Sequence, residues 1–431
     1  MESYDLVIIG AGFAGINASL RAKDLNLKVA LIEKDLLGGT CLNRGCIPTK
    51  SFIQSAKLYL KAKNILKINL PQIDFKELKD KKNNLIERLR LSLSNTLKNR
   101  NITYINSFAK FKSEHEIEVN GSVIEAKNII IAVGSRPQEL NFLKFDKKRV
   151  LSSDEILELD KIPSSILIVG AGVIGCEFAS LFNILGAEVT LVELLPHILP
   201  QEDNEISLRL LRIFKKRGIK VYTSFDLRNM DISNYELILV SVGRIPNTET
   251  LGLEKIGIKQ EKNWIVTDDY LKTNIPNIYA IGDCTNRLML AHLASYQGWQ
   301  VPENIVFPKE IKKIKNPYIP NCIFTYPEVA RVGLTEEEAK KQNLKFEINR
   351  FDFLGLGMSH ILEETEGLIK IIWDRETDSL LGASIIGPSA TEIIGILNLA
   401  IQNKIKISEL KNTIFAHPTI SECISEVLKQ C

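Results

Sequence analysis

The chain has 431 residues, of which 45% are hydrophobic and 25% charged, as expected of a soluble globular protein with about three domains. Its formal net charge of +3 is too small to indicate a nucleic-acid partner, and no apolar run approaches the length of about 18 residues that a membrane span needs. An acidic N-terminus that runs directly into an apolar strand predicts no signal peptide, and seven mostly unpaired cysteines favour a reducing cytoplasm.

The first predicted element is a dinucleotide-binding unit. An apolar strand at residues 6–9 leads into Gly10, Gly12 and Gly15, and a second apolar strand ends at Glu33. In this spacing the first glycine permits a tight turn, the second lets the backbone approach a pyrophosphate, and the third lets the helix pack on the strand. We expect the pyrophosphate at the helix N-terminus and a ribose diol at the acid.

Two cysteines, Cys41 and Cys46, follow closely after Glu33. On a regular helix, Cα atoms five residues apart lie roughly 8–9 Å from each other, whereas a disulfide tolerates at most about 7 Å. If the two are bonded, the helix must be distorted there, and we expect Gly45 to take up unusual dihedrals. A pair beside a dinucleotide fold favours a redox-active centre. The alternatives are a stapling disulfide, worth only about 2 kcal/mol for so short a loop, and a pair of metal ligands, for which no second close Cys/His pair is present.

The next segments predict scaffold. Residues 51–100 read as two amphipathic helices with an apolar stripe that indicates core packing. Residues 101–131 read as short strands around the turn Asn120–Gly121. A buried strand at residues 129–133 then ends at Gly134.

A second copy of the glycine pattern begins 160 residues after the first. It comprises Gly170, Gly172 and Gly175, and its second strand ends at Glu193. One GxGxxG run is weak evidence, but two copies in the same strand–turn–helix context strongly predict two Rossmann-like domains. A matching strand leads to Gly243, and a third apolar strand ends at Asp283. From about residue 319 the pattern changes to alternating strands and two late helices, which predicts a separate α+β domain.

Together these motifs resemble the flavoprotein pyridine nucleotide-disulfide oxidoreductases over essentially the whole chain. The resemblance is carried by the two fingerprints, Gly39–Pro48, Ala291–Ala294, Tyr326–Ala330 and Ala416–Glu422. It implies an α/β fold with two Rossmann-like dinucleotide-binding domains plus a C-terminal α+β dimerisation domain. The expected division is 1–150 for the FAD-binding domain, 151–250 for the NAD-binding domain, 251–318 for a central segment returning to the FAD domain, and 319–431 for the dimerisation domain.

The resemblance also implies roles for individual residues. Cys46 would face the flavin as the charge-transfer thiolate, and Cys41 would be the interchange thiol that meets substrate. Lys50 would lie near flavin N5, paired with Glu177. His417 and Glu422 resemble the family's base dyad, in which the histidine serves the active site of the other subunit; this implies an obligate homodimer.

Cofactor contacts follow in the same way. Glu33 would hold the FAD adenosine ribose, and Asp283 would bond the ribityl chain. Glu193 favours NAD over NADP, because a carboxylate repels a 2′-phosphate and the following Leu194, Leu195 and Pro196 offer no arginine. The other cofactor-binding residues that we expect are Thr40, Lys50, Gly134, Gly243 and Ala291, together with the six fingerprint glycines.

Within the family, the chain is most similar to the branch that oxidises dihydrolipoyl groups and reduces NAD. That implies a lipoylated carrier protein as partner, from a 2-oxoacid dehydrogenase complex or the glycine-cleavage system, and no metal, nucleic acid or membrane. The alternatives are a related disulfide or mercuric reductase, although Cys431 has no neighbour to form a C-terminal redox pair, and a non-catalytic flavoprotein subunit. In two places the chain departs from the family. Residues 221–237 leave too little room for the usual strand meander, and Phe415 replaces a histidine common before the His-Pro turn.

Overall fold

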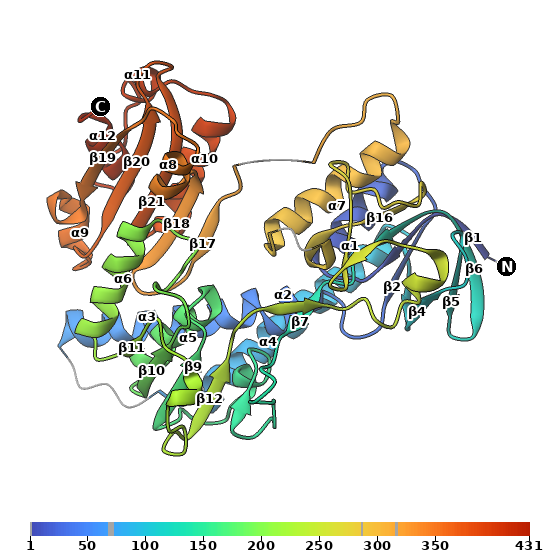
Figure 1. The fold of residues 1–431 in the computed structure, drawn as a ribbon, viewed down its shortest axis with the longest axis horizontal. Helices are drawn as coiled ribbons and strands as arrows, with labels where there is room; N and C mark the ends of the chain where they lie inside the picture. The colour runs from blue at the N-terminus through green and yellow to red at the C-terminus, as the bar shows by residue number, and fades with distance from the viewer. Residues whose placement is uncertain (1, 68–72, 286–287, 315–317) are drawn as a thin grey trace. The chain divides into compact units, whose positions relative to one another are not determined.

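The computed structural model describes residues 2–67, 73–285, 288–314 and 318–431. The chain forms two compact units, each assembled from three segments (Figure 1). Unit 1 comprises Met1–Ser51, Glu77–Gln138 and Gly243–Lys315, and unit 2 comprises Phe52–Lys76, Glu139–Val242 and Asn316–Cys431. The segment that follows the second fingerprint therefore returns to the unit that contains the first.

Unit 1 is built on a seven-stranded sheet with the order β3-β2-β1-β6-β5-β4, in which β16 also pairs with β6. The strands are β1 (Glu2–Ile9), β2 (Val29–Glu33), β3 (Thr103–Asn106), β4 (Ala109–Phe111), β5 (Glu116–Val119), β6 (Ser122–Ile131) and β16 (Ile278–Ala280). The strands β3, β2, β1, β6 and β16 are parallel, and their apolar runs are buried. The predicted turn joins β5 to β6, with φ values of 51° at Asn120 and 74° at Gly121.

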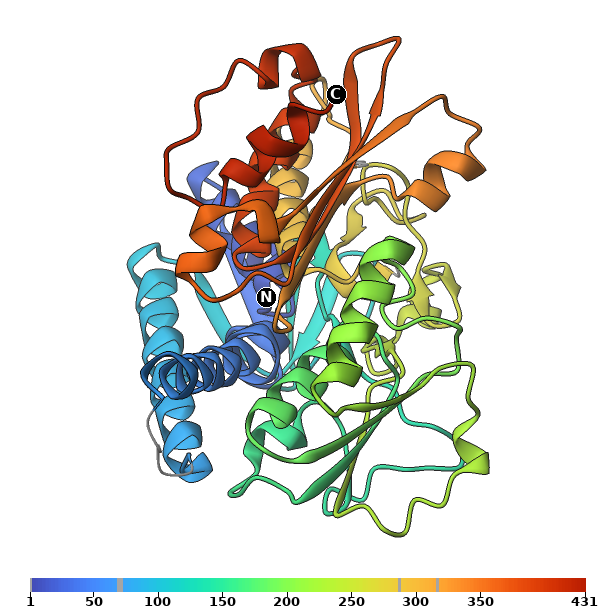
Figure 2. The same cartoon turned by 90° about the vertical axis from the view of Figure 1, so that its left-hand side faces the viewer.

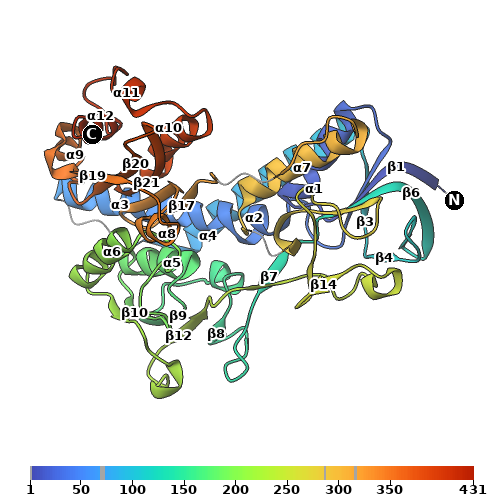
Figure 3. The same ribbon diagram turned by 45° about the horizontal axis from the view of Figure 1, so that its top comes forward.

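Helices α1 (Phe13–Asp24) and α7 (Ala291–Val306) run side by side in unit 1 (Figures 1 and 3). They approach so closely that a Cβ on Gly298 would lie 2.3 Å from the carbonyl oxygen of Ala14. Arg21 binds Glu303 across the pair at 2.6 Å. The cysteine run lies on α2 (Gly39–Arg44) and the start of α3 (Cys46–Leu66), and α4 (Phe75–Asn99) follows.

The nucleotide-binding part of unit 2 is an all-parallel sheet in the order β11-β10-β9-β12-β8. Its strands are β8 (Val150–Leu151), β9 (Ser165–Val169), β10 (Glu188–Val192), β11 (Lys220–Tyr222) and β12 (Leu237–Val240), and its helices are α5 (Val173–Ile184) and α6 (Asn204–Lys216). Between β11 and β12 the chain forms only a 3₁₀ turn, Leu227–Asn229, which confirms the predicted loss of a hairpin. Apolar side chains of this loop pack on the sheet instead, and Arg149 donates to the carbonyls of Ser233 and Tyr235 at 3.1 Å.

The C-terminal part of unit 2 is an antiparallel sheet in the order β17-β18-β21-β20-β19. Its elements are β17 (Asn321–Ile323), β18 (Glu328–Gly333), α8 (Glu336–Lys341), β19 (Glu347–Asp352), α9 (Gly357–Ile361), β20 (Leu368–Asp374), β21 (Ser379–Gly387), α10 (Ala390–Gln402), α11 (Ile407–Leu410) and α12 (Glu422–Leu428). Helices α10 and α12 cover one face (Figure 2), where Ile369 and Ile371 join their core. The predicted fold class is confirmed.

The opposite face of this sheet buries a charged cluster. Lys370, between Ile369 and Ile371 on β20, is 1% exposed, and its Nζ lies 2.9 Å from Asp203 and 2.7 Å from Glu336. Asp203 also caps α6 by accepting from the backbone N–H of Glu205 at 3.0 Å. The cluster therefore fixes the start of α6 to the C-terminal sheet.

The shorter elements complete the chain. Strand β7 (Ser135–Pro137) pairs with β13 (Arg244–Pro246), and β14 (Gln260–Glu261) pairs with β15 (Trp264–Ile265). The remaining 3₁₀ turns are Glu155–Glu158, Leu253–Ile256, Gly282–Thr285 and Phe353–Gly355. No helix within the described ranges is long and apolar enough to cross a membrane.

Candidate active site

The two glycine turns have the same geometry. Gly10 has a φ of 106° and Gly170 a φ of 95°, conformations that side chains rarely adopt. A Cβ on Gly10 would lie 2.3 Å from the carbonyl oxygen of Ala132, and one on Gly170 would lie 2.6 Å from that of Ser241. A Cβ on Gly15 would lie 1.8 Å from the carbonyl oxygen of Gly10, and one on Gly175 would lie 1.9 Å from that of Gly170. A side chain at Gly10 or Gly170 would clash with the backbone after a neighbouring strand, and one at Gly15 or Gly175 would push the helix away from its turn.

The middle glycines differ, because space is left beside them. A Cβ on Gly12 would meet only the Cα of Gly39, at 3.9 Å, and one on Gly172 would meet nothing within 4 Å. Both glycines are N-caps, of α1 and α5, and no side chain caps either helix. Open space at an uncapped helix N-terminus fits the pyrophosphate of a dinucleotide, which a side chain here would displace.

Both predicted ribose-binding acids are anchored by the turn that precedes them. Glu33 accepts from the backbone N–H of Ala11 at 2.7 Å and of Asp35 at 2.9 Å. Glu193 repeats this with Ala171 at 2.7 Å and Leu195 at 2.9 Å. Each carboxylate oxygen keeps a lone pair for a ribose hydroxyl, so the residues present fit FAD and NAD.

The cysteines lie on either side of a break in the helix. α2 ends at Arg44, and Gly45 has φ −138° and ψ −113°, values that belong to neither helix nor strand, before α3 begins at Cys46. A Cβ on Gly45 would lie 3.0 Å from the carbonyl oxygen of Thr40, so the break brings the chain back onto the preceding turn. The predicted distortion is present, and it brings the Cys41 and Cys46 side chains within hydrogen-bond reach of each other.

This contact sets the ionisation of the reduced pair. The hydrogen bond with Cys46, burial and the negative charge at Cys46 raise the pKa of the Cys41 thiol far above its ordinary value. The positive charge of Lys50, one turn into α3, acts in the opposite direction. Cys41 therefore keeps its proton at pH values where an ordinary thiol begins to lose it. The structure brings Thr40, Cys41, Cys46 and Lys50 together.

Asp283 is held by residues that the sequence did not single out. Its Oδ2 accepts from Ser135 Oγ at 2.7 Å, and Arg244 donates to the same hydroxyl at 2.7 Å. The preceding Gly282 donates its N–H to the buried Gln297 side chain on α7 at 2.7 Å. Gly134 and Gly243, which flank β7 and β13, have positive φ values of 66° and 130°. Ala291 is the first residue of α7.

Glu177 lies on α5 and is 2% exposed. It accepts from the backbone N–H of Phe324 at 2.9 Å, and Ser180, one turn later, accepts from that of Tyr326 at 2.9 Å. Helix α5 therefore holds the loop that joins β17 to β18. Lys50 and Glu177 belong to different units, and their pairing stays a prediction.

His417 and Glu422 form a hydrogen-bonded pair at the C-terminus of unit 2. His417 Nδ1 lies 2.9 Å from Glu422 Oε1, and the other carboxylate oxygen accepts from the N–H of Thr419 at 2.8 Å. The Thr419 N–H and then His417 hold the pKa of Glu422 below its usual range, so the carboxylate stays ionised. The His417 side chain is 77% exposed. The dyad thus presents an oriented imidazole to the outside of its own subunit.

Family models agree with this geometry. Residues 4–298 match the pyridine nucleotide-disulphide oxidoreductase model, and residues 319–428 match the dimerisation domain of the same family. The chain belongs to this family.

Individual relatives extend the match over the whole chain. Dihydrolipoyl dehydrogenase of Chlamydia pneumoniae is 37% identical over 446 residues, covering 99% of this chain and 96% of that protein. The Bacillus subtilis dihydrolipoyl dehydrogenase is 35% identical, covering 98% and 97%. Among solved structures, the HOCl-induced flavoprotein disulfide reductase RclA of Escherichia coli superposes with a TM-score of 0.90 at 28% identity, covering 99% of each chain. LpdA of Mycobacterium tuberculosis gives 0.92 at 26%, covering 100% and 99%.

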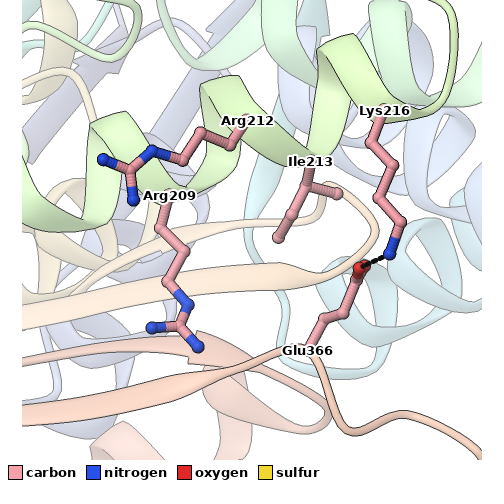
Figure 4. A pocket seen from close by; sticks show the side chains of 5 residues that line it. All are labelled: Arg209, Arg212, Ile213, Lys216 and Glu366. Atoms are coloured by element: carbon pink, nitrogen blue, oxygen red, sulfur yellow. Dashed lines mark hydrogen bonds and ion pairs between the residues drawn. The ribbon is translucent and has the colours of Figure 1, made fainter.

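A surface cavity of about 360 Å³ in unit 2 has none of these predicted residues in its lining (Figure 4). It is lined by Arg209, Arg212, Ile213 and Lys216 of α6 and by Glu366. Lys216 binds Glu366 at 2.5 Å, and Arg209 binds Asp352, so most of its charge is neutralised. Within the described part of the chain, no group of three or more His, Cys, Asp or Glu side chains could hold a metal ion.

Proposed function

We propose that this chain is a dihydrolipoyl dehydrogenase that oxidises dihydrolipoyl groups on a carrier protein through the Cys41–Cys46 disulfide. It is an FAD-dependent, NAD-linked disulfide oxidoreductase. The observation that carries the proposal is the broken helix at Gly45, which brings two thiols together within the unit that holds the first dinucleotide turn. Full-length similarity to dihydrolipoyl dehydrogenases supports the choice of substrate.

The first half-reaction is a thiol–disulfide exchange. His417 removes a proton from one substrate thiol, and Glu422, which stays ionised, orients the imidazole and stabilises its positive charge. The resulting thiolate attacks Cys41 Sγ, so that a mixed disulfide forms, the Cys41–Cys46 bond breaks, and Cys46 leaves as a thiolate. The second substrate thiol then attacks the substrate sulfur of the mixed disulfide, so that the cyclic disulfide forms and Cys41 is expelled. The proton that this second thiol loses ends on Cys41, and the proton of the first thiol stays on His417.

Bound at the first turn, FAD would supply a two-electron acceptor for the reduced cysteine pair and a hydride donor for NAD at the second turn. The chain supports that transfer in two ways. The hydrogen bond with Cys46 and burial raise the pKa of Cys41, so that Cys41 keeps its proton, and the thiol that we assign to the flavin side is Cys46. Glu33 and Glu193 fix the two ribose ends, and Glu193 accepts from a 2′-hydroxyl but repels a 2′-phosphate.

The exposure of His417 supports a homodimer, in keeping with the dimerisation domain of residues 319–428. An imidazole that its own subunit leaves 77% exposed is free to serve the cysteine pair of a partner subunit. Each subunit then contributes a base to a site that it does not complete alone. The proposal includes the four expected domains, with boundaries at residues 150, 250 and 318. It also includes the expected pairing of Lys50 with Glu177.

A comparison of substrates tests the function. Turnover with NAD should be fast on dihydrolipoamide and on a lipoylated carrier domain, and at least about tenfold slower, as kcat/KM, on glutathione disulfide, mercuric ion or Cu(II) with NADH. The assays with mercuric ion and Cu(II) distinguish a dihydrolipoyl dehydrogenase from a reductase of metal ions. A preference for glutathione disulfide or a metal ion would overturn the choice of substrate. A protein that purifies without flavin would overturn the proposal that the chain is an active flavoenzyme.

A further inference from the structure

Asn43 lies between the two cysteines and has no role in the mechanism above. Its side-chain Nδ2 donates to two backbone carbonyls: that of Leu37, in the preceding loop, at 3.1 Å, and that of Gly39, the first residue of α2, at 2.9 Å. Its Oδ1 is buried and finds no donor among the described residues. The two carbonyls fix the orientation of the carboxamide, because turning it over would place Oδ1 against two oxygens.

The loop that Asn43 holds lies directly against the first dinucleotide turn. Gly38 donates its N–H to the carbonyl of Ala11 at 2.9 Å. Gly39 approaches so closely that a Cβ there would lie 2.7 Å from the Cα of Gly12. Both glycines have positive φ values, 102° and 60°, that allow this approach. A continuous series of contacts therefore links the first dinucleotide turn, through Gly38 and Gly39, to Asn43.

The alternative, that Asn43 only fills space, does not account for its polar contacts. An apolar side chain of the same size would fill the site without leaving a buried oxygen unpaired, which is costly. The amide adds two hydrogen-bond donors. They bind the turn between Cys41 and Cys46, which carries Asn43, to the backbone of Leu37 and Gly39. The loop carbonyls of Leu37 and Gly39 would otherwise lose these donors.

We propose that Asn43 is a positioning residue that holds the cysteine turn in register with the dinucleotide turn, so that the thiol pair and the FAD keep one fixed separation. This rests on the proposed function, because it assigns the flavin to the first dinucleotide turn and the thiolate to Cys46. Asn43 touches neither substrate nor reacting atom. It acts through the Leu37–Gly39 loop on one side and the cysteine turn on the other.

The test uses Asn43→Asp, which keeps the shape of the side chain and removes both donors. The matched control is Asn304→Asp on α7, because the amide of Asn304 also binds a loop backbone, that of Lys312. Asn304 is 6% exposed, whereas Asn43 is half-buried, so the control is at least as sensitive to a new carboxylate. Both holoenzymes are reduced anaerobically with dihydrolipoamide, and the long-wavelength thiolate–flavin absorbance per bound flavin is recorded. The thermal midpoint and the rate of flavin reduction by NADH are measured in parallel.

We expect Asn43→Asp to lose most of the long-wavelength absorbance and to slow flavin reduction by dihydrolipoamide by roughly tenfold or more, as a misplaced reacting group does. Flavin reduction by NADH should change little, and Asn304→Asp should keep the absorbance at a similar thermal midpoint. A wild-type absorbance in Asn43→Asp would overturn the inference, as would an equal loss in Asn304→Asp. If the wild-type protein itself shows no such band, the proposed function fails first.

Discussion

Gly12 and Gly172 occupy matching positions in the two dinucleotide turns. Replacing either one by alanine adds a single methyl group, which tests one cofactor site at a time. In Gly172→Ala the added Cβ meets no atom of the protein within 4 Å, and the φ of −73° is one that alanine adopts. The loss at an N-cap and the gain from a less flexible unfolded chain are each below about 1–2 kcal/mol and oppose each other, so the free energy of unfolding should change by about 1 kcal/mol at most.

Binding should respond much more strongly. The methyl group of Gly172→Ala stands in the space at the N-terminus of α5 that the NAD pyrophosphate needs. We expect the Kd for NADH to rise at least about tenfold, equivalent to about 1.4 kcal/mol. Flavin content and single-turnover reduction of the flavin by dihydrolipoamide should stay unchanged, because the first dinucleotide turn is intact.

Three measurements check this reasoning: NADH binding by quenching of its fluorescence, flavin content by absorbance, and stability by urea unfolding. Gly12→Ala is the paired variant and should lower flavin content instead. Gly175→Ala, whose Cβ would lie 1.9 Å from the carbonyl oxygen of Gly170, should lose stability outright. An unchanged Kd for NADH in Gly172→Ala, or loss of flavin from it, would refute the assignment of the second turn to NAD.

Three further predictions concern the base dyad and the buried charge cluster. His417→Gln should abolish dihydrolipoamide turnover and slow alkylation of Cys41 in the reduced enzyme, whose raised pKa makes a base necessary, while leaving flavin reduction by NADH; equal loss of both reactions would contradict this. Because the pKa of Glu422 is lowered, its carboxylate is protonated, and its contact with the imidazole is lost, only as the pH falls through the lowered value. The kcat profile should therefore show no step in the ordinary carboxyl range, and a step there would contradict the role of Glu422. Lys370→Met should lower the free energy of unfolding by about 3–5 kcal/mol in urea, because Asp203 is left buried and unpaired, and Asp203→Asn should restore part of that loss in the double variant.

The parts of the site that the sequence predicts are local. Each glycine turn lies within a few residues of its strand and helix, so the spacing of the glycines predicts which one forms the turn and which one lets the helix pack on it. The helix break at Gly45 follows from the same reasoning, since five residues of regular helix hold two cysteines too far apart for a disulfide. The missing hairpin after β11 follows from length, because the segment is too short to form it.

The parts that the sequence did not reveal depend on contacts between distant residues. Ser135 and Arg244 hold Asp283, and they are 148 and 39 residues away from it along the chain, which no periodicity records. Gln297 contacts Gly282 because α7 happens to pass beside it. The position of Asn43 between the two cysteines is visible in the sequence. Only the structure shows that its amide binds the backbone carbonyls of Leu37 and Gly39.

The most direct test of the account is anaerobic titration of the wild type, Cys41→Ser and Cys46→Ser with dihydrolipoamide, followed by absorbance beyond the main flavin bands. We predict a long-wavelength band in the wild type, its loss in Cys46→Ser, and its presence in Cys41→Ser without any reductant, because the remaining thiolate already faces the flavin. A band that persists in Cys46→Ser, or that is absent from the reduced wild type, would contradict the claim that the cysteine pair delivers its electrons to the flavin.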